Sequence, residues 1–480
     1  MTKNYQRLCA ITLILALLVI FWGLGSVQLM SLNEGRRALV IKEMFASRNW
    51  LLPTQNGVLY LTKPPLLYWL SMVVSGCVGH VNEWTVRLPL AIAGFATIVI
   101  VYQYVLKKFG AWPALFSAQL LIANAGFAML ARRAEIEMLL TALCAGALIS
   151  ALRYIENAGH IEDPFKRAWL YVSYAMLGLA VLTKGPVALL FVTLPLIVAA
   201  IWTKDASLKK LLADLKGWSL FLLIGLSWYV VVSIQLGFDI WSTIAKRDML
   251  EKMQAAEAAK PLLSYVGWIA VDFLLLVGLF FIRPSALFKR YADKTEWKVL
   301  ILAVIVPLLV FSLFSNKHAK YLLPIYPAIA ILLGVQLGLI YEAASENIKR
   351  LILALGIILP ITLACFYMLV EPKYFAYRTV ALLQFKGWNE NKDTKNLYAF
   401  GNIDSRLIYY ASMPVKILNA PELDVLRNEK KSFLLLVEDE NIAKVSSKAD
   451  CKIEVFKPYL KKKKSLMVYG FGDFCQKNLN

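Results

Sequence analysis

Long apolar runs constrain this chain more than any other feature of its sequence. Four of them are near or above the length that crosses a bilayer: Leu8–Met30, Trp218–Gln235, Leu300–Phe314 and Leu351–Val370. Because 59% of the 480 residues are hydrophobic and only 18% are charged, a water-soluble fold would expose large hydrophobic patches on its surface. The sequence therefore predicts a polytopic membrane protein and excludes a secreted scaffold, a cytosolic enzyme and a fibrous chain.

The hydropathy pattern predicts an all-α bundle of eleven spanning helices over residues 1–370. An odd number of spans places the two ends of this bundle on opposite sides of the membrane. The spans are expected at about 8–30, 85–106, 113–131, 134–152, 168–183, 186–202, 217–236, 263–282, 298–315, 321–341 and 350–370.

One apolar segment, Pro64–Gly79, is short for a span, and its placement decides the side of every later loop. If it lies in the interface, the inside loops contain 18 Lys and Arg residues in about 70 positions, a higher density than in the outside loops. If it spans, this bias reverses. The positive-inside rule thus favours an interfacial helix, a cytoplasmic N-terminus and a periplasmic C-terminus.

Residues 371–480 differ from the rest, because their apolar runs are short and charges occur every few residues. The runs Phe433–Val437 and Ser465–Phe471 predict strands of a small C-terminal α/β domain. Cys451 and Cys475 both lie in this domain and could pair if it faces an oxidising compartment. The six cysteines show no metal-binding spacing.

The net charge of +20 divides into +14 for residues 1–370 and +6 for residues 371–480. In a membrane protein such an excess mainly orients the loops. We therefore expect membrane lipids as neighbours and no nucleic-acid partner.

Four clusters of ionisable residues lie at predicted helix ends, and on the interfacial topology all four share the outer side. They are NEGRR at 33–37, RRAEIE at 132–137, TKGP at 183–186 and NKHAKY at 316–321. Carboxylates that face lysines and arginines suit phosphate chemistry: the cations hold a phosphate leaving group, and a carboxylate orients or deprotonates the attacking group. Such charges also form the headgroup-level belt at many helix ends, so this structural interpretation stays open.

The sequence around these clusters resembles the bacterial polyprenyl-phosphate-dependent glycosyltransferases of the C-type membrane fold. Within them it is most similar to relatives of lipid A aminoarabinose transferase and of protein O-mannosyltransferases. The resemblance covers about residues 29–339 and rests on five motifs in order: NEGRRALVIKEMFASRNWLLPTQNGVLYLTKPPLLYW, EWTVRLP, ARRAEIEMLLTAL, GLAVLTKGPVALL and SNKHAKYLLPIYPAIAILLG.

The resemblance implies two interfacial helices in the first outer loop and a sugar donor carried on a polyprenyl phosphate. It also implies that Glu34 and Glu137 take the acidic catalytic positions. The donor phosphate is expected to contact Arg36, Lys63, Arg132, Arg133, Lys184, Lys317, Lys320 and Tyr321.

The chain departs from the family pattern at two positions. Asn33 stands where relatives have the first carboxylate of an Asp-Glu pair, and Thr62 stands where aminoarabinose-type relatives have Glu before Lys-Pro-Pro. The second departure weakens any metal proposal at that position, so a divalent cofactor is left unassigned.

The resemblance and the clusters together predict an inverting glycosyltransferase at the outer face of a bacterial inner membrane. Its acceptor is expected to be lipid A, another glycolipid or a protein. A transporter or flippase of a lipid-linked anion is the alternative, although no internal repeat is seen. An inactive relative that serves as a scaffold is a third interpretation, suggested by Asn33.

Overall fold

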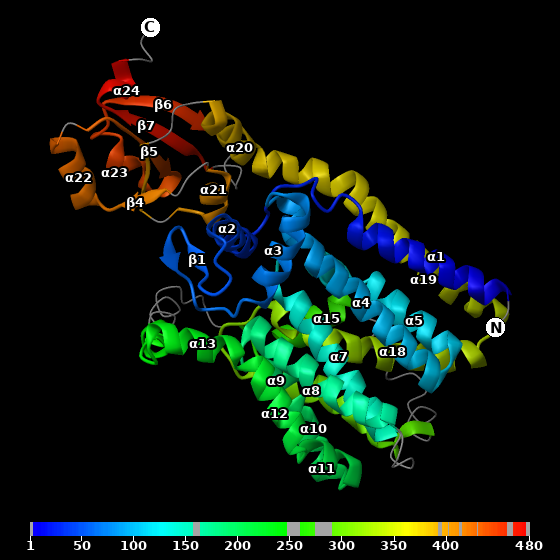
Figure 1. Ribbon diagram of the computed structural model, residues 1–480. Helices are drawn as coiled ribbons and strands as arrows, with labels where there is room; N and C mark the ends of the chain where they lie inside the picture. Colours follow the sequence, from blue (N-terminus) through cyan, green and yellow to red (C-terminus); the bar gives the residue numbers. More distant parts are fainter. Residues whose placement is uncertain are drawn as a thin grey trace. The chain divides into compact units, whose positions relative to one another are not determined.

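Figure 1 shows the computed structural model of the chain, with its helices and strands labelled. The chain divides into two compact units. We call them the bundle unit and the α/β unit, and describe each by itself. The bundle unit comprises Met1–Trp22, Leu61–Ser71 and Arg87–Phe366, and the α/β unit comprises Gly23–Tyr60, Met72–Val86 and Tyr367–Asn480. The structure describes residues 3–156, 164–246, 260–273, 290–391, 396–401, 403–411, 415–429, 431–457 and 464–476.

Within these described ranges, six helical segments are long and apolar enough to cross a membrane. They include α1 (Lys3–Phe21), α4 (Glu83–Phe109), α7 (Ile136–Glu156) and α17 (Thr295–Ser312). The fifth is Ala319–Ala343, made of the 3-10 helix η2 (Ala319–Ile325) and α18 (Tyr326–Ala343), and the sixth is Glu346–Phe375, which begins with α19 (Glu346–Cys365).

Two further predicted spans are broken helices. The span expected at 113–131 consists of α5 (Ala111–Ile122) and α6 (Ala125–Ala131), which bend by 67°, and the span at 217–236 consists of α12 (Leu215–Gly225) and α13 (Ser227–Leu236), which bend by 49°. Counting each bent pair once gives up to eight spans in the described part of the chain. The predicted bundle of membrane helices is confirmed in this coarser form, and the number eleven stays a prediction.

The other helices of the bundle unit are shorter or less apolar. They are α8 (Pro164–Lys184), α9 (Ala188–Phe191), α10 (Thr193–Thr203), α11 (Ala206–Leu212) and α15 (Ser264–Asp272). The predicted span 263–282 falls partly outside the described residues.

The predicted extent of the first span is wrong at its C-terminal end. Helix α1 ends at Phe21 rather than near Met30, because the chain turns at Gly23, whose φ of 59° is open to glycine at little cost. Glu34 therefore does not directly follow a membrane span.

The segment between α1 and α4 contains two helices, α2 (Leu32–Ser47) and α3 (Leu66–Val78), as the family resemblance implies. A short hairpin of β1 (Thr54–Gln55) and β2 (Val58–Leu59) lies between them. With 13 residues, α3 is short for a span, in keeping with the interfacial interpretation of Pro64–Gly79.

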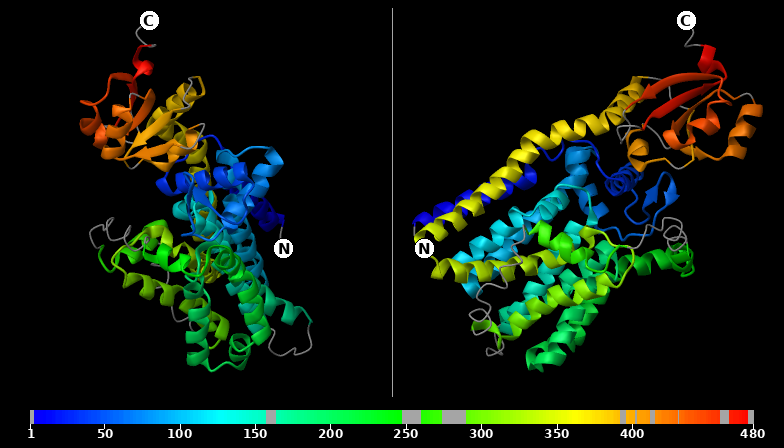
Figure 2. Two further views of the ribbon diagram at one scale, coloured as in Figure 1. Left: turned by 60° about the vertical axis from the view of Figure 1, so that its left-hand side comes forward. Right: turned by 180° about the vertical axis from the view of Figure 1, so that it is seen from behind.

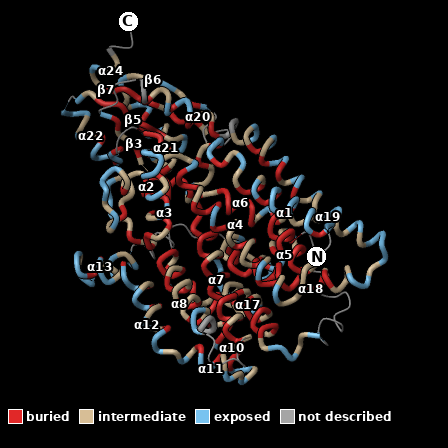
Figure 3. Tube along the Cα trace, turned by 45° about the vertical axis from the view of Figure 1, so that its right-hand side comes forward, coloured by how far each residue is buried: buried red, intermediate tan, exposed pale blue. Residues whose placement is uncertain are grey.

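The core of the bundle unit is built around α7 and α18. Helix α7 packs against α8, and α18 packs against α5. Both α7 and α18 are buried over most of their length, whereas α19 is largely exposed (Figure 3). Because α7 is enclosed by protein, its ends can position ionisable groups away from lipid.

The C-terminal part of the α/β unit, orange to red in Figure 2, contains a five-stranded sheet. The strand order is β4-β3-β5-β7-β6. Its strands are β3 (Leu397–Phe400), β4 (Lys416–Leu418), β5 (Phe433–Glu438), β6 (Cys451–Phe456) and β7 (Leu466–Phe471). The pairs β3–β4 and β3–β5 are parallel, and β5–β7 and β6–β7 are antiparallel. Strands β5 and β7 confirm the two strands predicted from the short apolar runs.

Helices cover this sheet and complete its core. Leu423 of α22 (Ala420–Asn428) and Val445 of α23 (Ile442–Val445) pack with Phe433 and Leu435 of β5. Helix α20 (Glu371–Asn391) carries helical structure well past residue 371, so the first strand starts only at Leu397. The predicted domain limit at 370/371 stays a prediction.

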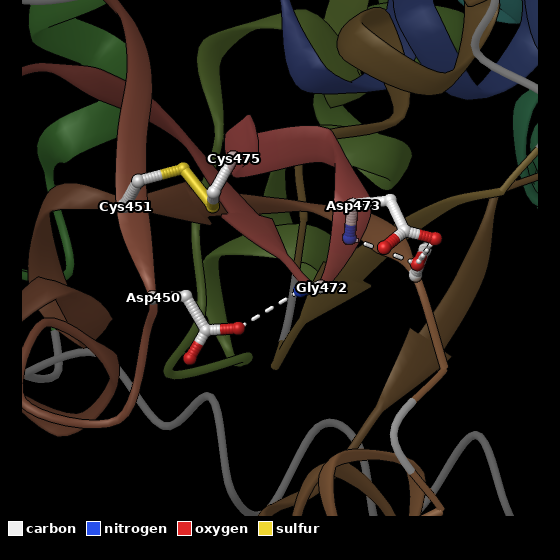
Figure 4. The surroundings of a disulfide bond; sticks show 6 residues. Asp450, Cys451, Gly472, Asp473 and Cys475 are labelled. Carbon is white, nitrogen blue, oxygen red and sulfur yellow. Dashed lines mark hydrogen bonds between the residues drawn. A yellow bond between two sulfur atoms is a disulfide. The ribbon is translucent and has the colours of Figure 1, made fainter. Parts of the chain in front are cut away.

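A disulfide joins Cys451 of β6 to Cys475 of α24 (Asp473–Gln476), as shown in Figure 4. Gly470 of β7 leaves room for it, because a Cβ there would lie 2.8 Å and 2.9 Å from the two sulfur atoms. The segment is also held by the Asp450 carboxylate, which accepts a hydrogen bond from the Gly472 amide at 2.8 Å. The pairing that the sequence left open is thus present.

We expect this disulfide to protect its two cysteines from alkylation in the isolated protein. Denatured, unreduced protein should take up the reagent at the four free cysteines, Cys9, Cys77, Cys144 and Cys365, but not at Cys451 or Cys475. Reduction before alkylation should add label at both, and peptide mass spectrometry measures the difference. Labelling of both cysteines without reductant would contradict the pairing.

Candidate active site

Three of the four ionisable clusters of the sequence meet in the bundle unit. One is the turn that leads into α7, another is the C-terminal end of α8, and the third is η2. Helix α7 packs directly against both α8 and η2. The local sequence explains the turn after α8, since Lys184 is followed by Gly185, which adopts a φ of 81° and donates its amide to the Val181 carbonyl at 2.7 Å.

Two carboxylate–ammonium pairs form the centre of this cluster. Lys184 Nζ lies 3.1 Å from Glu137 Oε1, and Lys320 Nζ lies 2.8 Å from Glu135 Oε2. The side chains of Glu137 and Glu135 are only 5% and 7% exposed, and those of Lys184 and Lys320 are 16% and 21% exposed. The charge of Lys320 acts on both carboxylates. At this depth each charge needs an opposite charge close by to remain ionised.

Tyr321 completes the cluster. The Lys184 ammonium lies over its ring, 4.8 Å from the centroid, and the ring of His318 meets it edge-on at 5.1 Å. A cation over an aromatic face gains electrostatic attraction. The Lys184 ammonium is therefore held by both the Tyr321 ring and the Glu137 carboxylate.

Glu137 has one oxygen that the protein does not satisfy. Its Oε1 accepts a hydrogen bond from the Lys184 ammonium, but Oε2 is buried and has no hydrogen-bond partner among the described residues. Buried carboxylate oxygens without a partner are rare and costly. This oxygen is the strongest single sign that the cluster is built to meet a ligand.

The structure also brings in Glu135, which the sequence analysis placed in a cluster but did not select. The available signal was its spacing: Glu135 and Glu137 flank the first residue of α7, and η2 provides a lysine for one of them. Sequence spacing alone did not show which of the two carboxylates would face which lysine.

Lys317 is placed differently from the other predicted donor-site residues. Its ammonium donates to the carbonyls of Phe314 and Lys260, at 2.6 Å and 3.2 Å, and Lys260 donates in return to the Lys317 carbonyl. These bonds fasten the turn before η2 to the chain at Lys260. The geometry favours a structural role for Lys317.

Arg132 also serves the backbone. Its Nη1 donates to the carbonyls of Val19, Ile20 and Trp22, at 3.0, 3.3 and 2.8 Å. These are the last carbonyls of α1 and the turn that follows, which have no partner within the helix. Arg132 thus caps α1, while its neighbour Arg133 is half-buried.

Lys63, the remaining predicted phosphate contact of the bundle unit, is half-buried just before the Pro64-Pro65 step. Its Nζ donates to the Thr62 carbonyl at 3.2 Å.

The fourth cluster lies in the α/β unit, on the first turns of α2. Ser31 caps this helix, because its hydroxyl accepts the Glu34 amide at 3.0 Å, and Glu34 Oε2 accepts the Met30 amide at 2.7 Å. A backbone amide, that of Met30, is thus a partner of the Glu34 carboxylate that the sequence did not predict. The Ser-x-x-Glu spacing of residues 31–34, typical of helix N-termini, was the missed signal.

The two arginines of this cluster have different surroundings. Arg37 donates to the Tyr60 hydroxyl at 3.1 Å and lies near its ring. Arg36 is half-buried, and its Nε has no hydrogen-bond partner among the described residues. Of the two, Arg36 keeps more capacity to bind an anion.

No group of three or more His, Cys, Asp or Glu side chains that could hold a metal ion occurs in the described residues. A divalent cofactor therefore remains without assigned ligands.

The chain is similar to several known proteins. The family model for dolichyl-phosphate-mannose-protein mannosyltransferases matches residues 62–230. An uncharacterised protein of Aquifex aeolicus is 27% identical over 396 residues, which is 81% of this chain and 84% of the relative. An undecaprenyl phosphate-alpha-4-amino-4-deoxy-L-arabinose arabinosyl transferase of Shewanella sediminis is 24% identical over 369 residues, or 73% of this chain. The match spans 63% of that transferase, less than two thirds of its length.

Solved structures show the same fold over nearly the whole chain. ArnT from Cupriavidus metallidurans, bound to undecaprenyl phosphate, aligns with a TM-score of 0.80 at 19% identity, over 96% of this chain and 97% of that one. An oligosaccharyltransferase from Archaeoglobus fulgidus aligns with a TM-score of 0.57 at 12% identity, over 92% of this chain and 70% of that one.

The chain is thus a multi-pass membrane protein with the C-type glycosyltransferase fold. Its resemblance to the polyprenyl-phosphate-dependent glycosyltransferases of this fold is confirmed. It is similar to the aminoarabinose transferase of Shewanella sediminis over 73% of its length, and its fold is similar to that of ArnT from Cupriavidus metallidurans over 96%.

We expect the Glu135–Lys320 pair to matter for stability as a pair. Lys320→Met should lower the free energy of unfolding by about 3–5 kcal/mol, because it leaves the Glu135 carboxylate buried without its cation. Adding Glu135→Gln should restore most of this loss, and thermal unfolding in detergent measures both. Equal destabilisation in the single and double variants would show that the two side chains do not interact.

Proposed function

We propose that this protein transfers a sugar from a polyprenyl-phosphate donor to a cell-envelope acceptor, with inversion at the anomeric carbon. The observation that carries the proposal is the buried cluster in which Lys184 and Lys320 are paired with Glu137 and Glu135. In this cluster one Glu137 oxygen has no hydrogen-bond partner within the described part of the chain. The similar aminoarabinose transferases and the undecaprenyl phosphate bound to ArnT support a lipid-linked donor.

The cations of the cluster suit the leaving group. A polyprenyl phosphate becomes more negative as the bond between its oxygen and the anomeric carbon breaks, and ammonium groups stabilise this charge best where water is excluded. In the free protein Lys184 and Lys320 are neutralised by carboxylates. The donor phosphate competes with the carboxylates for the same ammonium groups. The charges of the cluster therefore cancel in the absence of donor, and the ammonium groups bind the phosphate when the donor enters.

The carboxylates suit the acceptor. An attacking hydroxyl must lose its proton as its oxygen bonds to the anomeric carbon, and a nearby carboxylate can accept that proton. Glu34 and Glu137 are the candidates for this role, one in each unit, with Arg36 and Lys63 as further phosphate contacts. A phosphate acceptor would need orientation rather than deprotonation.

The acceptor we favour is lipid A or a similar glycolipid, because the similar transferases of known name act with aminoarabinose carried on undecaprenyl phosphate. We propose that transfer takes place on the periplasmic face of the bacterial inner membrane, with the N-terminus in the cytoplasm. The Cys451–Cys475 disulfide supports this orientation, since disulfides persist in the periplasm and are rare in the cytosol.

The transfer activity is tested by the masses of cell-envelope glycolipids in strains with the gene intact, deleted, or restored as a variant. Deletion should remove a sugar-sized mass from lipid A, and neither Glu34→Gln nor Glu137→Gln should restore it, because losing a general base lowers the rate by about 100-fold or more. Glu346→Gln, a change at an exposed carboxylate paired with Lys349, is the matched control and should restore it fully.

Each other outcome of this experiment has a definite meaning. If deletion leaves the glycolipids unchanged but polyprenyl-phosphate sugar accumulates, the transferase activity is supported and the acceptor is a different molecule. Unchanged pools of both donor and acceptor would contradict the proposed function and favour the transporter. An active Glu34→Gln protein would remove Glu34 from the mechanism.

Donor binding is expected to depend on Lys184. Undecaprenyl phosphate should raise the unfolding temperature of the protein, because a ligand that binds only the folded state stabilises it. In Lys184→Met the affinity should fall by about 10- to 100-fold, the cost of losing one charge-assisted hydrogen bond. Lys349→Met, a change at a partly exposed lysine that pairs with Glu346, should bind like the wild type. Unchanged affinity in Lys184→Met would contradict the assignment.

A further inference from the structure

Within the α/β unit, helix α2 is held by a short helix of the C-terminal part, α21 (Ser405–Tyr410), which packs directly against it. The contact is unusually close at Gly35, the residue after Glu34. A Cβ at this position would lie 2.5 Å from Arg406 Cγ and 3.0 Å from the Arg406 amide nitrogen. Only glycine lets α21 approach this closely, although alanine would suit a helix better.

Arg406 links α21 to the backbone that positions Glu34. Its guanidinium is fixed by a two-point contact with Asp404, at 2.9 Å and 2.6 Å, and its Nη1 donates to the Met30 carbonyl at 2.8 Å. The amide of the same residue, Met30, donates to Glu34 Oε2. A chain of two hydrogen bonds thus runs from Arg406 through Met30 to the Glu34 carboxylate.

Tyr410, at the C-terminal end of α21, bonds to the segment that leads into α2. Its hydroxyl accepts the Leu29 amide at 3.1 Å and donates to Glu83 Oε1 at 2.6 Å. Burial, and then the charge of Glu83, raise the pKa of Tyr410 well above its ordinary value. The phenol therefore stays protonated and continues to donate over the physiological range.

Lys42 fastens the middle of α2 to the end of α21. Its Nζ donates to the carbonyls of Tyr409 and Ala411, at 2.6 Å and 2.8 Å. These carbonyls lie at the C-terminal end of α21, where a cation is favoured by the helix dipole. Lys42 thus attaches α2 itself to α21, while Arg406 and Tyr410 attach the segment just before α2, at Met30 and Leu29.

We propose that Arg406 and Tyr410 are positioning residues that set the orientation of Glu34 for the acceptor reaction. In this proposal the C-terminal part of the chain is a support for the catalytic segment, because its helix α21 determines where the first turns of α2 lie. The proposal rests on the proposed function, in which Glu34 orients or deprotonates the acceptor. Misplacement of such a group by about 1 Å is enough to lower a rate by about 100-fold.

The test compares Arg406→Met and Tyr410→Phe with the wild-type protein, all full-length in detergent or vesicles. Arg406→Met removes the bond to the Met30 carbonyl but keeps the apolar stem, and Tyr410→Phe removes one hydroxyl but keeps the ring. Lys448→Met is the matched control, since it breaks the partly exposed Lys448–Asp424 pair in the same part of the chain. Three quantities are measured: kcat of sugar transfer, affinity for undecaprenyl phosphate, and the unfolding temperature.

We expect kcat to fall by about 10-fold or more in both variants, in line with a misplaced catalytic group. Donor affinity and unfolding temperature should stay close to those of Lys448→Met. Full kcat in both variants would overturn the proposal, and so would a fall in kcat matched by losses of donor affinity and unfolding temperature, because that is a general structural effect. If Arg406→Met does not fold, Tyr410→Phe decides.

The same assay separates this proposal from the proposed function. A wild-type protein without transfer activity would overturn the transferase itself. An active wild type with an active Glu34→Gln would remove the role of Glu34, and this inference with it. An active wild type and inactive Glu34→Gln, with full activity in Tyr410→Phe and Arg406→Met, would overturn only the positioning role.

Discussion

The electrostatic pairing of carboxylates with lysines at one end of the bundle is the interaction on which the candidate site depends. Glu137 with Lys184, and Glu135 with Lys320, bring four charges into a region that excludes most water. Ions are costly to bury there unless they are paired. This cost fixes the packing of α7, α8 and η2 against one another, because separating any of them would leave a buried charge unpaired.

A second set of cations, in both units, stabilises the backbone rather than facing a ligand. Arg132 caps α1, Lys317 fastens the turn before η2, and Lys42 caps α21. Each donates to carbonyl groups that have no partner in regular structure. In the sequence Arg132 and Lys317 look the same as Lys184 and Lys320, since all four are basic residues at helix ends. The two groups differ in the acceptor that each cation contacts: a backbone carbonyl for Arg132 and Lys317, and a carboxylate for Lys184 and Lys320. The proposed mechanism therefore relies on the lysines that pair with carboxylates.

Much of the fold could be predicted from the sequence, because it follows from local properties. The apolar runs that form α4, α7 and α18 are long enough to be recognised as membrane spans from the sequence. The strands β5 and β7 are recognised as short apolar runs between charged residues. The limits of elements were harder to predict. Helix α1 ends early at a glycine turn, and the spans near 113–131 and 217–236 are bent pairs. These breaks depend on packing and capping contacts with distant residues, such as Arg132 at the end of α1.

The sequence by itself determined the class of protein and the residues from which a site could be built, since hydrophobicity, charge and motif order are properties of the chain. Only the tertiary structure decided which of those residues meet. It paired Glu135 with Lys320, left Glu137 Oε2 without a partner among the described residues, and placed Arg406 against Gly35. The physical reason is that ion pairs, orphaned oxygens and close approaches depend on distances of a few ångströms between segments far apart in sequence, and helical periodicity carries no information about such distances.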